Sequence, residues 1–345
     1  MIRSVPGLHV NRHWVPVAPL RRRRCRHRAR PAPIRRHRTR AVLIPHEETK
    51  AMTDNRLDVP IRSRYLDTQF GRLHVREHDG DGPPVVALHG FPDDSRIYDR
   101  IAPQLAPRRL LAVDFVGFGH SDRVDYDDLP PDRREEEVGA VLDGLGLDRA
   151  TIIGHDASGA VAINFTLAHQ DRVDHLILLN CYYGSDPDLR LPEMIRLLGD
   201  PHFTPLADAL LGDPAMRQWL LAHTRRQFGY EVDDPHGVAV ASVVPQFFGE
   251  TGWPDALAAI RAWTGTLYPE LDRQDRQISA GKLATITVPV TVAFGRDDQY
   301  LNPTVAAHLA ARFTNASLHL INDASHWPQW DQPAITARMI AGDAP

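Results

Sequence analysis

Apolar and polar residues follow two different patterns in the part of the chain after residue 60. Residues 61–68 and 71–79 alternate between the two kinds around a turn at Phe70-Gly71, which predicts an antiparallel pair of strands. Further along, short apolar runs bounded by turn residues predict buried parallel strands. These runs are residues 84–88, 110–115, 150–153, 175–179, 288–294 and 317–321.

Stretches with helical spacing separate most of these runs, for example residues 97–105, 135–145 and 160–169. Regular alternation of strand and helix predicts an α/β fold in which helices cover both faces of a mostly parallel sheet, and we expect eight strands. One interval, residues 183–281, shows no strand pattern but helical segments between prolines and glycines, at residues 191–198, 205–211, 214–227 and 254–263. We therefore expect a core of residues 52–182 and 282–345, and a helical cap over the strand ends.

The first 51 residues differ from the rest because they lack apolar periodicity and repeat arginine, proline and histidine. Their 13 arginines and one lysine against two glutamates give +12, which leaves −16 for the rest of a chain with a net charge of −4. Basic tails of this kind bind nucleic acid or act as targeting peptides. Met52-Thr53-Asp54 resembles an ordinary start, however, so we interpret residues 1–51 as a disordered extension or a stretch that is not translated.

Composition narrows the class of protein. Hydrophobic residues make up 43% of the 345 residues, but no apolar run approaches the roughly 18 residues of a membrane span. Two cysteines, Cys25 and Cys181, are too few for a disulfide framework, which fits a reducing cytoplasm. We expect a cytoplasmic protein without cofactor or metal that binds neither nucleic acid nor membrane. The sequence does not indicate an oligomeric state.

The segment of residues 151–160 predicts the chemistry. An apolar strand runs into Gly-His-Asp-Ala-Ser-Gly at residues 154–159, and a helix follows. Small residues on both sides of Asp156 allow a tight strand-to-helix turn with an exposed side chain at its tip. Serine is the usual residue there. Two alternatives are that Asp156 caps the helix and that Ser158 is the nucleophile, although Asp156 is too large for the position two residues before a nucleophile.

Three further segments fit such a turn in a consistent order. His89-Gly90-Phe91-Pro92 follows the third strand, residues 294–298 follow a late strand, and His326 follows the last strand. A nucleophile, then an acid, then a histidine along the chain is the order that this turn requires. The order favours a catalytic role for Asp156 over a helix cap.

From residue 52 onward the chain resembles the α/β-hydrolase superfamily, specifically its epoxide hydrolase and haloalkane dehalogenase branch. The resemblance implies that Asp156 is the nucleophile and that Asp298 orients His326, with Asp297 as the alternative acid. It also implies a helical cap in the place of the insertion. The matching segments are residues 89–92, 114–122, 154–156, 295–298 and 326–329.

An aspartate nucleophile would work in two steps. A carboxylate is already ionised near neutral pH, so Asp156 can attack saturated carbon directly and form an alkyl ester. His326 would then activate a water that attacks the ester carbonyl. The resemblance implies that the backbone N–H groups of Phe91 and Ala157 hold the resulting oxyanion, and that the Phe91-Pro92 bond is cis.

The substrate is less well indicated. Ala157 stands where dehalogenases often have tryptophan, and many epoxide hydrolases have tryptophan there too. Phe91 stands where dehalogenases often have asparagine or tryptophan, and the arginines that haloacid enzymes carry near the nucleophile are missing. Epoxide hydrolases commonly use two cap tyrosines to protonate the ring oxygen. The tyrosines of this region are Tyr182, Tyr183, Tyr230 and Tyr268.

Among these tyrosines we expect Tyr268, and then Tyr183, to act as cap acids. Trp253, Trp263 and Trp327 are candidates for an apolar pocket wall. We interpret the chain as an epoxide hydrolase that acts on a small apolar organic substrate with water. The alternatives are a haloalkane or haloacid dehalogenase, an ester or carbon–carbon bond hydrolase, and a non-catalytic binding protein of the same fold.

Overall fold

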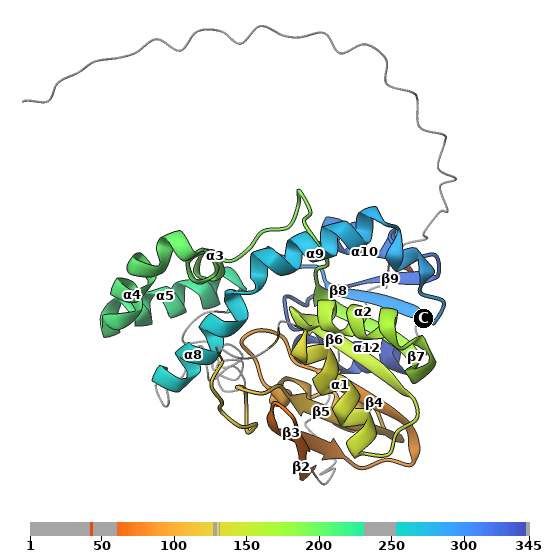
Figure 1. Cartoon of the computed structure of the whole chain (residues 1–345). Coiled ribbons are helices and arrows are strands. Elements are labelled where there is room, and N and C mark those ends of the chain that lie inside the picture. The colour runs from red at the N-terminus through yellow and green to blue at the C-terminus, as the bar shows by residue number, and fades with distance from the viewer. Residues whose placement is uncertain (1–41, 44–60, 127–129, 131, 231–252, 343–345) are drawn as a thin grey trace, which may run out of the picture. The chain divides into compact units, whose positions relative to one another are not determined.

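The computed structural model describes residues 42–43, 61–126, 130, 132–230 and 253–342 (Figure 1). Its strands form one nine-stranded sheet in the order β1-β9-β8-β7-β6-β4-β5-β3-β2. Only the pairs β2–β3 and β3–β5 are antiparallel. The strands are β1 Val42–Leu43, β2 Ile61–Thr68, β3 Gly71–His78, β4 Gly82–Leu88, β5 Arg108–Asp114, β6 Ala150–Asp156, β7 Val173–Cys181, β8 Val290–Gly295 and β9 Ala316–Ile321.

Alternate residues of the central strands pack on opposite faces of the sheet, as the period of a strand requires. In β4, Val86 and Leu88 belong to one buried cluster, whereas Val85 and Ala87 belong to the other. The first cluster includes residues of α1, α2 and α10, and the second includes residues of α11 and α12. These helices are α1 Arg133–Gly144, α2 Ser158–Ala168, α10 Pro303–Ala310, α11 Pro328–Asp331 and α12 Pro333–Ala341.

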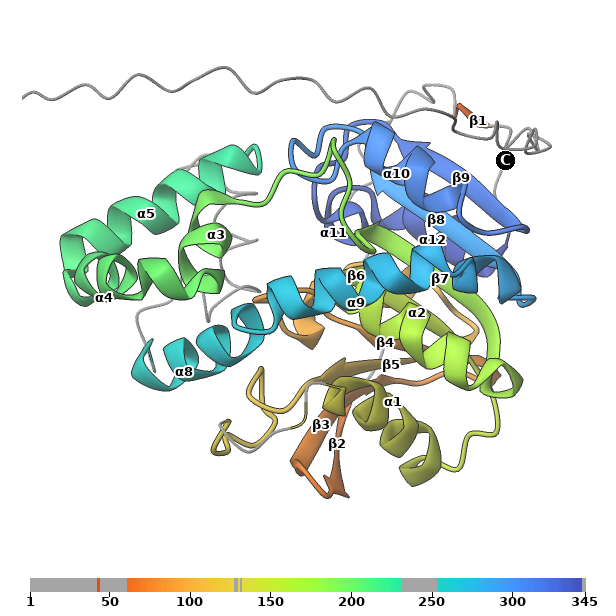
Figure 2. The same cartoon turned by 45° about the horizontal axis from the view of Figure 1, so that its top comes forward.

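The chain between β7 and β8 is helical wherever it forms regular structure in the described residues. Figures 1 and 2 show α3, α4 and α5 grouped to one side of the sheet, while α9 runs from α8 back toward it. Asp213 begins α5 by accepting the N–H groups of Ala215 and Met216, with Pro214 in the first turn. These helices are α3 Glu193–Gly199, α4 Thr204–Gly212, α5 Pro214–Gln227, α8 Trp253–Thr264 and α9 Leu267–Ser279.

The fold class predicted from the sequence is confirmed, with three differences. Val42–Leu43, inside the expected extension of residues 1–51, pairs in parallel with β9 and adds a ninth strand. The rest of that range lies outside the described residues, so its expected disorder stays a prediction. Residues 97–105 form two short 3₁₀ segments and no α-helix, because Pro103 lacks the N–H that a helix interior needs. Finally, α9 was not expected, since Pro269 and dense charge obscure its apolar stripe.

No helix in the described part of the chain combines the length and the apolar character needed to span a bilayer.

Candidate active site

The turn after β6 has the geometry that its small residues predict. Asp156 adopts φ 50°, in the left-handed region, and α2 begins two residues later. A Cβ on Gly154 would lie 2.8 Å from the Cα of Gly159, so strand and helix can approach this closely only with glycine there. The turn holds the Asp156 side chain at its tip with 15% of its surface exposed.

Ser158, the alternative nucleophile, is fully buried and engaged in the framework of the turn. Its hydroxyl lies 2.9 Å from the carbonyl oxygen of Leu88 and 2.8 Å from that of His155, and it accepts the His155 N–H at 3.0 Å. A hydroxyl held in this way joins β4 to the start of α2. It does not face the cavity that Asp156 lines.

The structure brings Asp156, His326 and Asp298 together from three separate segments. Nε2 of His326 lies 3.9 Å from Oδ1 of Asp156, and Nδ1 of His326 lies 2.8 Å from Oδ2 of Asp298. The first distance is too long for a hydrogen bond, so Nε2 is available to a water, while the second fixes the orientation of the ring. Asp297 is exposed and Asp298 is buried, which favours Asp298 as the partner.

Asp298 is held by more than the histidine. Its Oδ1 accepts the backbone N–H groups of Tyr300 and Leu301 at 2.8 and 3.1 Å. Its Oδ2 also accepts Nδ2 of Asn180 at 2.9 Å, and Oδ1 of Asn180 accepts the N–H of Gly295 at 2.7 Å. Sequence reasoning missed this role of Asn180, although a polar residue near the end of a buried strand was the available signal.

A second buried group lies behind the histidine. Nε2 of His155 is 2.8 Å from the carbonyl oxygen of His326, and its Nδ1 is 3.4 Å from Oδ2 of Asp93. The same Oδ2 accepts Nε1 of Trp327 at 2.9 Å. The Trp327 N–H is thus occupied inside the protein, although the ring lines the cavity.

The predicted oxyanion donors, the N–H groups of Phe91 and Ala157, lie against Asp156. The Phe91 N–H donates to Oδ2 of Asp156 at 2.9 Å. The Ala157 N–H also hydrogen-bonds Asp156 and lowers its pKa. The Phe91-Pro92 peptide bond is cis, so that prediction is confirmed.

Burial and charge shift the pKa values of all three side chains. Burial raises the pKa of Asp156 above its usual range, while His326, His155 and the two backbone amides oppose that rise. The pKa of His326 is raised to about 9, because Asp298, Asp156 and Asp93 together outweigh the opposite effect of burial. The pKa of Asp298 is lowered, since His326 and two backbone amides outweigh its burial. A protonated His326 between two carboxylates is therefore the resting state near neutral pH.

A cavity lies between the strand ends and the cap, and Asp156 and His326 line it. Phe91, Trp263 and Trp327 contribute aromatic surface, as expected for the last two, whereas the side chain of Trp253 lies outside the described residues. One part of the lining carries charged side chains, which we call the charged side. Its members are Arg134, Glu135, Glu270 and Arg273.

The two expected cap acids do not line the cavity. Tyr268 is 40% exposed on α9. The hydroxyl of Tyr183 is bonded to Asn164 and Gln277 at 2.6 and 2.7 Å. Tyr182 and Tyr300 line it instead. Tyr182 and Tyr183 are neighbours at the end of a strand, so their side chains point in different directions, and the sequence did not show which one turns inward.

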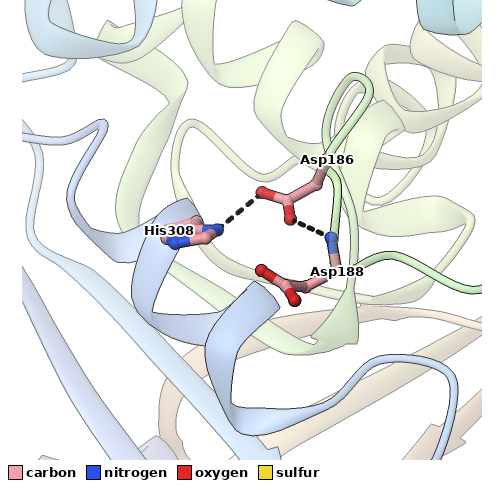
Figure 3. A group of neighbouring side chains, drawn as sticks. All are labelled: Asp186, Asp188 and His308. Carbon is pink, nitrogen blue, oxygen red and sulfur yellow. Dashed lines mark hydrogen bonds and ion pairs between the residues drawn. The ribbon is translucent and has the colours of Figure 1, made fainter.

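Outside the cavity, the described residues contain one group whose side chains are spaced for a metal ion: Asp186, Asp188 and His308 (Figure 3). Nδ1 of His308 already binds Oδ2 of Asp186 at 2.9 Å, and Arg312 lies 3.8 Å from the same oxygen. The neighbouring guanidinium disfavours a cation there. Exposed acidic groups of this kind are common without a metal, and the group carries no conclusion about one.

Comparison with known proteins identifies the family. A family model described as the alpha/beta hydrolase family matches residues 85–339. The chain belongs to this family. This hydrolase is 28% identical over 283 residues to haloalkane dehalogenase 2 of Mycobacterium tuberculosis, covering 81% of this chain and 94% of that protein. It is 27% identical over 284 residues to a 2-hydroxy-6-oxononadienedioate/2-hydroxy-6-oxononatrienedioate hydrolase of Cupriavidus pinatubonensis, covering 79% and 90%.

Solved structures agree on the fold. The 2-hydroxy-6-oxo-6-phenylhexa-2,4-dienoate hydrolase of a Rhodococcus strain superposes with a TM-score of 0.65 at 19% identity, covering 83% of this chain and 99% of that chain. A Pseudomonas aeruginosa protein provisionally described as an epoxide hydrolase gives 0.62 at 21% identity, covering 82% and 94%. This chain is thus a hydrolase of the alpha/beta family, and its similarities extend to relatives with different reactions.

Proposed function

We propose that this hydrolase forms an alkyl ester on Asp156 and that the bond it opens is the carbon–oxygen bond of an epoxide. The observation that carries the proposal is the turn after β6, where a carboxylate occupies the tip, 3.9 Å from Nε2 of His326, and the neighbouring Ser158 hydroxyl is buried in backbone hydrogen bonds. No serine is available there to act as the nucleophile.

In the first step an oxygen of Asp156 attacks one epoxide carbon. The carbon–oxygen bond of the ring breaks, and the ring oxygen takes a proton from Tyr182. Burial and the charge of Asp156 raise the pKa of Tyr182, whereas Arg134 lowers it. Ester formation removes the charge of Asp156, so the Tyr182 hydroxyl becomes more acidic as the ring oxygen needs its proton.

In the second step His326 takes a proton from water, and the water oxygen attacks the ester carbonyl carbon. The N–H groups of Phe91 and Ala157 hold the oxyanion. When the ester bond breaks, the alcohol oxygen takes the remaining proton of the attacking water, and the carboxylate of Asp156 is restored. Before this step the proton that His326 carries at rest passes to Tyr182 through solvent. The proton taken from water then leaves His326 charged again, so the products are a diol and the original enzyme.

Three observations favour an epoxide over a carbon–halogen bond. Tyr182, which carries a hydroxyl, lines the cavity, whereas the Trp327 N–H, a potential halide ligand, is held by Asp93. The residue after the nucleophile is Ala157, which has no donor in its side chain. Tyr182, Trp327 and Ala157 thus offer a halide leaving group no pair of free side-chain N–H donors.

The two steps can be separated in a His326→Gln variant. Asp156 needs no base for its attack, so this variant is expected to form the ester and then stop, because no group remains to take the proton from water. Intact-protein mass spectrometry with styrene oxide and 1-bromobutane as separate probes would show the added mass, and peptide mapping would locate it. An adduct on Asp156 from the epoxide alone supports the proposal. An adduct from the bromide alone would replace the epoxide with a carbon–halogen bond, and an adduct on Ser158 would reject the carboxylate mechanism.

A further inference from the structure

The charged side of the cavity contains a cation that the proposed reaction does not use for bond making. Arg134 is 4% exposed and lines the cavity together with Asp156. Its guanidinium lies 3.8 Å from the centre of the Trp263 ring. Within the described residues, neither its Nε nor its Nη2 has a hydrogen-bond partner.

The acidic groups closest to Arg134 are engaged elsewhere. Glu135 and Glu270 both bind Arg273, at 2.9 and 2.6 Å. Glu137 pairs with Arg133 at 3.3 Å and accepts the N–H of Val116 at 3.1 Å. Burial raises the pKa of Glu137 to about 7, while the charges of Arg133 and Arg134 oppose that rise. The charges of Glu137, Glu135 and Glu270 thus act on Arg134, but among the described residues none of these carboxylates forms a close ion pair with its guanidinium.

Apart from its contact with the Trp263 ring, the placement of Arg134 is unfavourable for the stability of the fold. A buried charge without a partner is unfavourable, and cations are disfavoured in the first turn of a helix, where α1 begins at Arg133. Burial and the charge of Arg133 lower the pKa of Arg134 only to about 9, so it stays a cation at neutral pH. An unpaired cation in a ligand cavity is typical of a site for an anion.

We infer that Arg134 binds a carboxylate group of the substrate, so that this hydrolase prefers organic acids to apolar molecules of the same shape. The inference deepens the proposed function and rests on it for the reacting bond. Tyr182, Asp156 and Arg134 line one cavity, and the charges of both Asp156 and Arg134 act on the Tyr182 hydroxyl. The carboxylate would thus bind in the same cavity as the reacting carbon, with its two oxygens facing the guanidinium.

A binding experiment tests this inference without any turnover. The dissociation constants of phenylacetate and of 2-phenylacetamide, which have the same shape but different charge, would be measured by calorimetry on the full chain. The acid is expected to bind the wild-type protein about tenfold or more tightly than the amide, as for a charge-assisted pair. Arg134→Met is expected to remove that preference, and Arg134→Lys to keep part of it.

Two controls decide what a loss would mean. Arg190 is exposed at the same cavity, so loss of the preference in Arg190→Met, and not in Arg134→Met, would overturn the assignment. Equal weakening of acid and amide in Arg134→Met would also overturn it, because Arg134 would then only support Trp263. If Arg134→Met does not fold, equal binding of the two probes by the wild-type protein still rejects the inference. Failure of the proposed reaction is a separate outcome, because it concerns the adduct on Asp156.

Discussion

The two sides of the cavity are built in different ways. One side contains Asp156, His326 and Asp298, and we call it the nucleophile side. There Asp298 accepts four hydrogen bonds, which fix its carboxylate and, through it, the orientation of His326. On the charged side, Arg134 has unpaired nitrogen atoms in the described structure and rests on an aromatic ring. The first arrangement is complete before a substrate arrives, whereas the second is completed by a ligand. Residues that act in the reaction and residues that recognise the substrate can thus be distinguished by whether other groups of the protein form all their hydrogen bonds.

Among single substitutions, replacement of Asp156 on the nucleophile side should cause the largest loss of turnover. Asp156→Ala is expected to lower turnover by at least about 10⁴-fold, because no other side chain can form the ester. Ser158→Ala is the matched control. It should cost about 1–3 kcal/mol of unfolding free energy through the lost buried hydrogen bonds, yet keep turnover within a few-fold. Steady-state rates and urea unfolding of both variants check this, and an inactive, well-folded Ser158→Ala would contradict the comparison.

The adjacent aspartates provide the next test. Asp298→Ala is expected to reduce the rate of ester hydrolysis by about 10³–10⁴-fold, since His326 loses the group that orients it. Asp297→Ala should stay within about threefold, because its side chain is exposed. Single-turnover kinetics separate ester hydrolysis from ester formation. The reverse ranking of the two variants would mean that the acid is Asp297.

Substitution of Tyr182, which lines the same cavity, should lower the reaction rate by a smaller factor. Tyr182→Phe is expected to slow ring opening by about 10²-fold, the usual contribution of one general acid, and to leave hydrolysis of the formed ester nearly unchanged. Tyr183→Phe and Tyr268→Phe should each change the rate by less than about threefold. Pre-steady-state measurements on an epoxide compare the three. A strong effect of Tyr268→Phe alone would restore the original expectation for that residue.

Protonation of His326 should contribute to stability in a defined pH window. Its folded pKa of about 9 exceeds the ordinary value of 6.5, so its contribution is fully present below pH 6.5 and is lost as the pH rises from 6.5 to 9. The unfolding free energy of the wild-type protein relative to His326→Gln should therefore fall over this range, by an amount on the order of 3 kcal/mol. Urea unfolding at several pH values measures it, and a flat difference would contradict the charged resting state.

Removal of residues 1–51 should have the smallest effect. The described part of that range contributes one two-residue strand at the edge of the sheet, so a chain that begins at Met52 should lose less than about 1 kcal/mol of unfolding free energy. Turnover should be unchanged. Thermal unfolding and activity of the shortened chain test this, and a large loss of either would assign the segment a structural role.

The sequence predicted the nucleophile side far better than the charged side, for a physical reason. Glycines near Asp156 and the acid and histidine after late strands are local signals, and the carboxyl ends of parallel strands bring them to one edge of the sheet. Arg134 gives no such signal, because Arg-Arg-Glu-Glu-Glu at residues 133–137 is typical of a solvated helix start.

The cap was predicted in outline only. Its helical character follows from spacing, but the residues that face the cavity depend on how each helix is rotated against its neighbours. Tyr268 on α9 was therefore expected inside and is 40% exposed. Asn180 shows the same limit within the core, since its bonds to Asp298 and Gly295 depend on the packing of two adjacent strands.

The charge of Asp156 has a further consequence for the order of events. It is one of the charges that raise the pKa of His326 to about 9, and it exists only while the carboxylate is free. Once an ester forms, that contribution disappears and the imidazole can release its proton more readily. In the proposed reaction the histidine thus becomes a base mainly in the covalent intermediate, where a water must be deprotonated, and stays a cation in the empty site. The electrostatic interaction between Asp156 and His326 would thus by itself determine which of the two proposed steps comes first.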